Sequence, residues 1–297
     1  MIEQKAPVIS DGLRLDGAFF TDENVNNPDL PIVIVCSGFT GQKNIHPERY
    51  ARALTAKGFT VFGFDYRGFG ESEGIRERVI LDEQVRDIAN AVAVVKKRAD
   101  EEGRKVVLAG WGMAGGLILD AYRVCQDAID GLISMNGFYD AVRVQVAQRG
   151  EHGWKAFRQF MLEERTRLAL GGEKQGIDPF EIYPLDPVSR EYVFTELVKV
   201  PGYGVTSDLD FADSLINFKP EALLDERFAD APILIAHGAE NDLHPVTEAK
   251  SLYAKYPGPK SLFLLSEGGH TEWMLDDDPK FIQFSGVIAN WLSENFS

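Results

Sequence analysis

One glycine-rich turn constrains the fold of this chain more than any other feature. The apolar run at 106–109 is rich in β-branched residues and stops at Gly110, and residues 117–122 have the spacing of a helix. The chain therefore reverses direction around Gly112. So tight a turn accepts only small residues, because a Cβ atom there would collide with the neighbouring strand or with the start of the helix. The sequence predicts a buried strand, a sharp elbow and a helix.

The rest of the chain repeats this alternation of strand and helix. An Asp11-Gly12 pair predicts a tight antiparallel hairpin near the start. Continuous apolar runs predict strands buried on both faces, and segments with helical spacing lie between them. The expected strands are 32–36, 59–64, 106–109, 131–135, 232–238 and 261–265, and the expected helices are 48–57, 79–99, 246–256 and 279–295. Such repeated units predict a mostly parallel sheet with helices on both faces.

Residues 138–229 interrupt this alternation. They contain Gly171-Gly172, several prolines and many aromatic residues, without repeating strands and helices. We therefore expect a core built from residues 1–137 and 230–297, with 138–229 inserted after the sixth strand.

Composition narrows the functional classes. The 297 residues carry a net charge of -15, which argues against nucleic acid or an anionic membrane as a partner. No apolar run is long enough to span a membrane, and we expect a cytoplasmic protein. The two cysteines have no metal-ligand spacing. We expect a small-molecule substrate and neither a metal nor a cofactor, and a homodimer remains open.

Three motifs resemble the α/β-hydrolase superfamily, in particular its lid-bearing esterases and acyl hydrolases. Gly110-Trp111-Gly112-Met113-Ala114 resembles the Gly-x-Ser-x-Gly nucleophile elbow, with glycine in place of serine. The loop 237–246 resembles the family's His-Gly-x-x-(x)-Asp loop, and Gly268-Gly269-His270 resembles its histidine loop. The order of elbow, acid and histidine along the chain is also that of the family.

The resemblance implies roles for individual residues. Gly112 stands at the nucleophile position, Asp242 is the expected acid with Glu240 as its competitor, and His270 is the expected base. The loop at Ser37–Gly41 falls where the family builds its oxyanion hole. The backbone N–H of Phe39 or Thr40 is expected to contribute to that hole, together with the N–H of Met113.

The aromatic lid suggests an apolar or aromatic substrate. The expected substrate-binding residues are Trp111, Trp154, Phe160, Tyr203 and His244. The lid aromatics have an alternative role as the lid's own core.

The missing serine leaves three hypotheses. In the first, the chain is an ester, thioester or amide hydrolase whose nucleophile was replaced by Gly112. In the second, a His270–Asp242 dyad acts directly as a general base, as in lyases, in C–C bond cleavage or in cofactor-free chemistry. In the third, the chain binds a ligand without turning it over. A dinucleotide site at Gly110-x-Gly112-x-x-Gly115 is disfavoured because this strand is not the first of the fold.

Overall fold

A computed structural model describes residues 1–39, 41–204 and 206–297 of the chain. Its centre is an eight-stranded sheet in the order β1-β4-β6-β5-β7-β8-β9-β10. Strands β5 to β10 run parallel to one another, whereas β1 and β4 are antiparallel additions at one edge. The strands are β1 (Ile2–Lys5), β4 (Gly17–Thr21), β5 (Ile32–Cys36), β6 (Thr60–Phe64), β7 (Val106–Trp111), β8 (Gly131–Met135), β9 (Ile233–Gly238) and β10 (Lys260–Leu265). The predicted α/β-hydrolase architecture is confirmed.

The predicted hairpin pairs β2 (Val8–Ser10) with β3 (Leu13–Leu15). Its turn residues Asp11 and Gly12 have φ angles of 49° and 82°. Such angles allow a two-residue connection, because they match the twist of the flanking strands.

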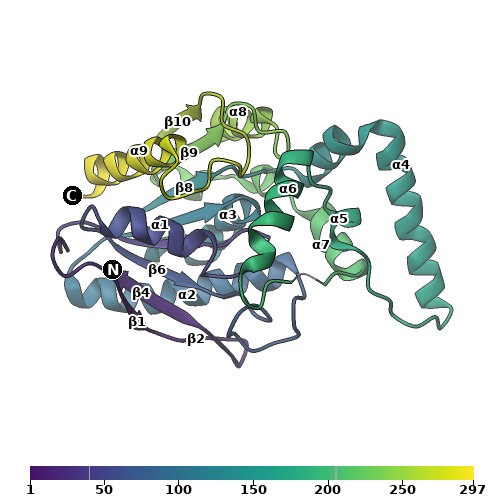
Figure 1. The fold of residues 1–297 in the computed structure, drawn as a ribbon, viewed down its shortest axis with the longest axis horizontal. Coiled ribbons are helices and arrows are strands. Elements are labelled where there is room, and N and C mark those ends of the chain that lie inside the picture. The colour runs from purple at the N-terminus through teal and green to yellow at the C-terminus, as the bar shows by residue number, and fades with distance from the viewer. Residues whose placement is uncertain (40, 205) are drawn as a thin grey trace.

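Helices cover both faces of the sheet (Figure 1). Helices α1 (His46–Thr55) and α9 (Pro279–Phe296) pack on one face, and α2 (Leu81–Glu102), α3 (Met113–Cys125) and α8 (Val246–Lys255) pack on the other. Strand β5 divides its side chains between the two: Ile32 and Ile34 join the core under α2 and α3, whereas Val33 and Val35 join the core under α1. This two-sided burial explains why β5 is a continuous apolar run.

The segment between β8 and β9, residues 138–229, is here called the cap segment. It is helical, and it extends to one side of the sheet (Figure 1). Its α-helices are α4 (Ala141–Ala169), α5 (Pro179–Ile182), α6 (Pro187–Thr195) and α7 (Leu209–Asn217). Helix α4 is broken at Gly150, whose φ of 67° and ψ of 168° are not helical. Whether the cap segment is a separate domain stays a prediction.

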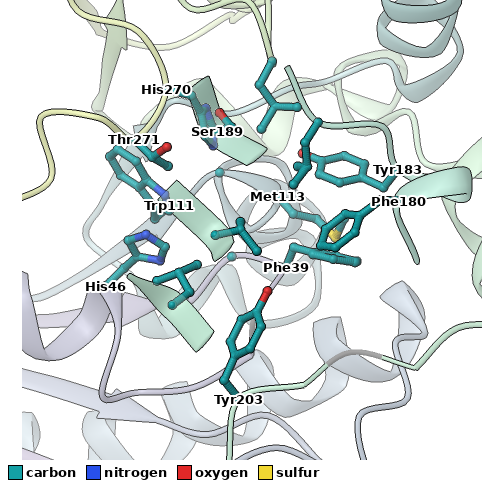
Figure 2. A pocket seen from close by; sticks show the side chains of 16 residues that line it. Phe39, His46, Trp111, Met113, Phe180, Tyr183, Ser189, Tyr203, His270 and Thr271 are labelled. Carbon is teal, nitrogen blue, oxygen red and sulfur yellow. The ribbon is translucent and has the colours of Figure 1, made fainter. Parts of the chain in front are cut away.

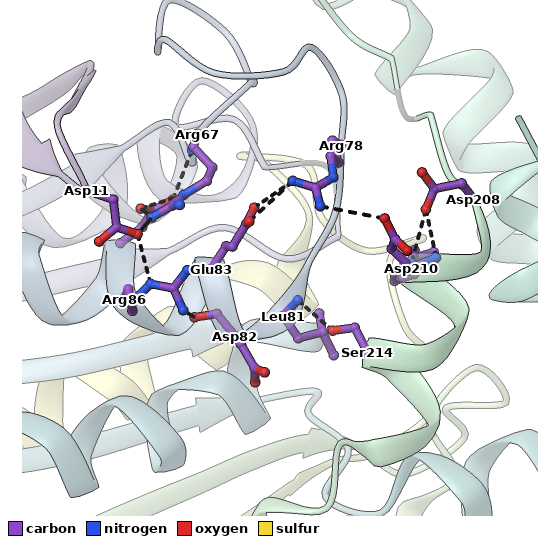
Figure 3. Close-up of polar contacts among 12 residues, drawn as sticks. Asp11, Arg67, Arg78, Leu81, Asp82, Glu83, Arg86, Asp208, Asp210 and Ser214 are labelled. Atoms are coloured by element: carbon purple, nitrogen blue, oxygen red, sulfur yellow. Dashed lines mark hydrogen bonds and ion pairs between the residues drawn. The ribbon is translucent and has the colours of Figure 1, made fainter. Parts of the chain in front are cut away.

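Polar contacts join the cap segment to α2 (Figure 3). Arg78 lies 3.2 Å from Glu83 and 3.7 Å from Asp210 of α7. The backbone N–H of Leu81, at the start of α2, donates to Oγ of Ser214 at 2.8 Å. These contacts fix α7 against the first turn of α2.

A more buried cluster fixes the base of the cap segment. Arg143 of α4 donates to Glu221 at 2.6 Å and to Oε2 of Glu248 at 2.6 Å. The side chains of Glu221 and Glu248 are only 3% and 1% exposed. Glu248 belongs to α8, so Arg143 connects the cap segment with the sheet's own helices.

Asp65 and Arg67 hold the loop after β6 through polar contacts. Asp65 accepts hydrogen bonds from the backbone N–H groups of Lys43 and Glu71, and Arg67 pairs at 2.6 Å with fully buried Asp87.

The described helices include no candidate for a membrane span, because none of them combines sufficient length with sufficient apolar character.

Candidate functional site

The predicted elbow is present between β7 and α3. Gly112 has φ 59° and ψ -121°, and its N–H donates to the carbonyl of Met135 at 2.8 Å. A Cβ at Gly110 would lie 2.2 Å from the carbonyl oxygen of Ala114, so only glycine allows the helix to begin so close to the strand. At Gly112 a Cβ would instead lie 3.6 Å from Nε2 of His270, which is an ordinary contact. The nucleophile position therefore faces His270 and has room for a side chain.

His270 follows β10 and is held over the elbow from several sides. Its carbonyl accepts from Nδ2 of Asn136 at 2.8 Å. Its ring lies 5.7 Å from the Trp111 ring and 4.7 Å from the His244 ring, measured between centroids. The prediction that His270 meets Gly112 agrees with this geometry.

The predicted acid is not beside His270. Nδ1 of His270 lies 3.0 Å from Nδ2 of Asn241. Asp242 and Glu240 are both exposed, and no hydrogen bond joins either carboxylate to His270 among the residues described. The residue that contacts the His270 ring is thus Asn241 and not the expected Asp242, because a single sequence does not fix where the loop after β9 bends.

A hydrogen bond to Oδ1 determines the orientation of the Asn241 side-chain amide. Oδ1 of Asn241 accepts the backbone N–H of His244 at 2.9 Å, and that group can only donate. Nδ2 must then face His270, and an amide nitrogen also only donates. Nδ1 of His270 is therefore the acceptor, and the ring proton lies on Nε2, the atom that faces Gly112. This is the opposite of the tautomer that a carboxylate partner imposes.

Two more buried histidines surround this pair. His244 contacts the carbonyl of Asn136 through Nδ1 at 2.6 Å and the hydroxyl of Tyr183 through Nε2. Nε2 of His237 donates to the carbonyl of His244 at 2.8 Å. Burial lowers the pKa of His237 to about 4 and that of His244 to about 3, and it places the pKa of His270 well below its ordinary value. The rings are therefore neutral at pH 7.

A pocket opens over the elbow, with about 480 Å³ of empty space including its mouth. Figure 2 shows a polar side formed by His46, Trp111, His270 and Thr271. The opposite side is aromatic and apolar. The other lining residues are Gly38, Phe39, Gly112, Met113, Phe180, Tyr183, Leu185, Ser189, Val193, Leu197, Tyr203 and Leu243. No Asp, Glu, Lys or Arg is among these described lining residues.

The predicted substrate-binding residues divide into two groups. Trp111 and Tyr203 line the pocket, and Tyr203 comes from the cap segment. His244 lies behind His270 and contacts its ring. Trp154 and Phe160 do not line the pocket, because they lie on α4 and pack around Phe157, with Phe160 37% exposed. Their aromatic character belongs to the cap segment itself, as the alternative interpretation held.

Sequence reasoning missed His46, Phe180, Tyr183 and Thr271 in this pocket. His46 is the first residue of α1, and no motif marked it. Tyr183 is one of many aromatic residues in the segment 138–229, and Thr271 follows His270; no motif distinguishes either of them. The contact of Tyr183 with His244 could not be derived from the sequence, because the cap segment lacks a regular pattern.

The expected oxyanion donors Met113 and Phe39 both line the pocket, and their role stays a prediction. Met113 begins α3, so its N–H is one of those that a helix leaves without an intrahelical partner. A Cβ at Gly38 would lie 3.7 Å from the nitrogen of Met113, and Phe39 lines the pocket next to it. Thr40, the alternative donor, lies outside the described residues.

Within residues 1–39, 41–204 and 206–297, no three His, Cys, Asp or Glu side chains gather as metal ligands. The polar groups around Gly112 are hydrogen-bond donors and neutral imidazoles, a set suited to an uncharged oxygen atom.

Known proteins resemble this chain in sequence and in structure. Residues 28–277 match the model of the family described as "Serine aminopeptidase, S33". A 31.7 kDa Escherichia coli protein from the traX-finO intergenic region is 24% identical over 268 residues, which are 89% of this chain and 91% of that protein. DcsB in complex with its substrate analogue superposes with a TM-score of 0.77 at 18% identity, over 99% of both chains. The α/β-hydrolase GrgF from Penicillium sp. sh18 also has a TM-score of 0.77, at 16% identity over 100% of this chain and 99% of its own.

Proposed function

Because the chain belongs to the serine aminopeptidase S33 family of α/β-hydrolases, we propose that it binds a small acyl compound by its carbonyl oxygen at Gly112, without forming a covalent intermediate. The acyl compound is an ester, a thioester or an amide. The carbonyl oxygen accepts hydrogen bonds from Nε2–H of His270 and from the N–H of Met113. The chain thus keeps the carbonyl-binding part of a hydrolase site and lacks its nucleophile.

The contact of Asn241 with His270 carries this proposal. In a serine hydrolase the histidine accepts the hydroxyl proton through Nε2, and a carboxylate at Nδ1 supports that tautomer. Here Nδ1 accepts from Asn241 at 3.0 Å, and Nε2 is the donor. His270 is therefore suited to polarise a carbonyl group and not to activate a hydroxyl group or a water molecule.

The same contact argues against two of the three hypotheses. A hydrolase that lost only its serine would retain a carboxylate at Nδ1, yet Asn241 stands there. A His–Asp general base would need Asp242 in that position, and Asp242 is exposed. The third hypothesis, in which the chain binds a ligand without turning it over, agrees with Asn241 at Nδ1 of His270 and with the exposure of Asp242.

The pocket lining supports an uncharged ligand. The described lining residues carry no charged side chain, and the aromatic rings of Phe39, Phe180 and Tyr183 lie near one another. A carboxylate buried there would have no cation to pair with, and an unpaired buried charge is strongly disfavoured. An acyl chain or ring against these aromatic side chains is favoured by the hydrophobic effect.

A matched pair of ligands tests the proposal. Methyl octanoate and methyl octyl ether differ only in the carbonyl oxygen, so the difference in their affinities isolates the hydrogen bonds to it. We expect calorimetry to give about tenfold tighter binding of the ester, from two hydrogen bonds that each contribute about 0.7 kcal/mol net of desolvation. The ratio should fall towards one in His270→Phe. Equal affinity of the unaltered protein for ester and ether would refute the proposal.

A further inference from the structure

His46 is a buried histidine that lines the pocket and has no role in the proposed carbonyl-binding site. It begins α1 and stacks on Trp111, with 5.1 Å between the ring centroids and 24° between the planes. The residue is only 4% exposed. Neither ring nitrogen has a hydrogen-bond partner among the described residues. A residue that lines the pocket thus carries two buried polar atoms without a partner among the described residues.

Such atoms are costly in a core that exists only for packing. A buried polar atom without a partner destabilises a protein by about 1–3 kcal/mol. His244, which is equally buried, pairs both of its ring nitrogens, and His237 pairs Nε2. A phenyl ring at position 46 would stack on Trp111 as well as imidazole does, so packing alone does not explain the histidine.

Thr271 adds a second unpaired group to the same side of the pocket. The residue is 7% exposed, and its Oγ1 has no partner among the residues that the structure describes. Trp111 separates the two imidazoles, because its ring contacts both His46 and His270. Figure 2 shows His46 and Thr271 at the edges of Trp111, on the side of the pocket away from Phe180 and Tyr183.

The protonation state of His46 indicates which group it binds. Burial, helped by the nearby charge of Arg49, lowers the pKa of His46 to about 3. The neutral ring offers one N–H donor and one acceptor nitrogen, and the threonine hydroxyl can likewise donate and accept. A ligand hydroxyl satisfies both kinds of group, and a ligand carbonyl satisfies the donors.

We propose that His46 and Thr271 form a second polar binding point, which takes a hydroxyl or ketone oxygen of the acyl compound held at Gly112. This inference rests on the proposed function and narrows its ligand class to oxygenated acyl compounds. The ligand lies along Trp111, with its ester carbonyl at His270 and its second oxygen at His46. Its remaining carbon atoms face the aromatic side of the pocket.

A series of methyl esters tests this inference. The probes are methyl octanoate and three methyl hydroxyoctanoates that carry the hydroxyl group near the ester, in the middle of the chain or near its end. We expect at least one hydroxy ester to bind about tenfold more tightly than methyl octanoate, because it pairs polar groups that are otherwise unpaired. The preference, expressed for each variant as the ratio of its affinities for the hydroxy ester and for methyl octanoate, should disappear in His46→Phe and weaken in Thr271→Val.

Control variants separate recognition from folding. His46→Asn keeps a donor and an acceptor and should retain part of the preference for a hydroxy ester over methyl octanoate. His152 is an exposed histidine of α4, and His152→Phe should retain the whole preference. The free His46→Phe protein should unfold at the same temperature as the unaltered protein or higher, since it lacks two unpaired atoms. A lower temperature would indicate a structural role for His46 and contradict the inference.

The outcomes also separate this inference from the proposed function. If methyl octanoate binds but no hydroxy ester is preferred, the second binding point is refuted and the carbonyl site remains. If the preference survives in both His46→Phe and Thr271→Val, the second binding point is likewise refuted. If no ester binds, the carbonyl site itself is refuted, and the second point with it.

Discussion

Nδ2 of Asn241 lies 3.0 Å from Nδ1 of His270, at the place where a hydrolase of this architecture has a carboxylate. Since the amide nitrogen only donates, the proton of the imidazole is on Nε2. Because of this one residue, Nε2 of His270 offers the pocket a hydrogen-bond donor, where the histidine of a serine hydrolase offers an acceptor. Gly112 and Asn241 together remove two of the three groups on which covalent catalysis depends.

Asn241→Asp should return the ring proton to Nδ1. A carboxylate accepts where the amide donates, so the Nδ1–H tautomer becomes the favoured one and the pKa of His270 rises. Nitrogen-15 NMR of the histidine rings at pH 7 distinguishes the two tautomers. Asp242→Asn is the matched control, because Asp242 is exposed and its variant should leave the His270 signals unchanged. An Nδ1–H tautomer in the unaltered protein would contradict the assignment.

Gly112→Ser alone should give little esterase activity. Its side chain fits, since a Cβ there lies 3.6 Å from Nε2 of His270, but Nε2 would donate to the hydroxyl group when it should accept its proton. Gly112→Ser combined with Asn241→Asp should hydrolyse p-nitrophenyl esters about 10⁴-fold faster than Gly112→Ser, the usual effect of a wrong tautomer in a triad. Equal rates for the two variants would show that Asn241 does not limit the site.

The serine should also destabilise the elbow. Gly112 has a φ of 59° and a ψ of -121°, a conformation that costs a residue with a side chain about 1–3 kcal/mol. Urea unfolding of Gly112→Ser should give a lower free energy of unfolding by this amount. A stability equal to that of the unaltered protein would mean that the elbow relaxes to accept the side chain.

Two arginines of α4 should differ in their effect on stability. Arg143→Met leaves the nearly buried carboxylates of Glu221 and Glu248 without their shared partner, and we expect a loss of about 2–4 kcal/mol. Arg165→Met removes an exposed pair with Asp213 and should cost less than about 1 kcal/mol. Urea unfolding curves measure both, and equal losses would refute the role given to Arg143 at the base of the cap segment.

Stability should fall as the pH decreases below about 6.5. The buried histidines have pKa values below those in the unfolded chain, so the unfolded chain binds more protons in this range and is favoured. For His46, with a folded pKa of about 3, the loss between pH 7 and pH 5 is about 2 kcal/mol. His46→Phe should reduce the total loss over this range by that amount. An unchanged pH dependence would contradict a neutral, buried His46.

The architecture could be predicted from the sequence because local patterns determine it. The apolar run at β5 requires burial on both faces, Asp11 and Gly12 require the hairpin turn, and the glycines around Gly112 require the elbow. Each of these follows from the chemistry of adjacent residues, and the structure places all three as expected.

The site could be predicted only in part because it depends on contacts between distant segments. His270 and Gly112 were found through their glycine-rich loops. Whether Asn241 or Asp242 contacts His270 depends on where the loop after β9 bends. The unpaired nitrogens of His46 depend on how α1 packs on Trp111. Neither leaves a local pattern in the sequence.

The central claim is that the pocket binds an acyl compound and leaves it intact. Incubation of the unaltered protein with octanoyl thioester, followed by mass spectrometry of both protein and ligand, tests this directly. The account predicts that ligand is retained in proportion to protein, that it is recovered unchanged, and that the protein gains no mass. Saturable release of octanoate that is lost in His270→Phe, or an acyl group attached to the protein, would contradict it.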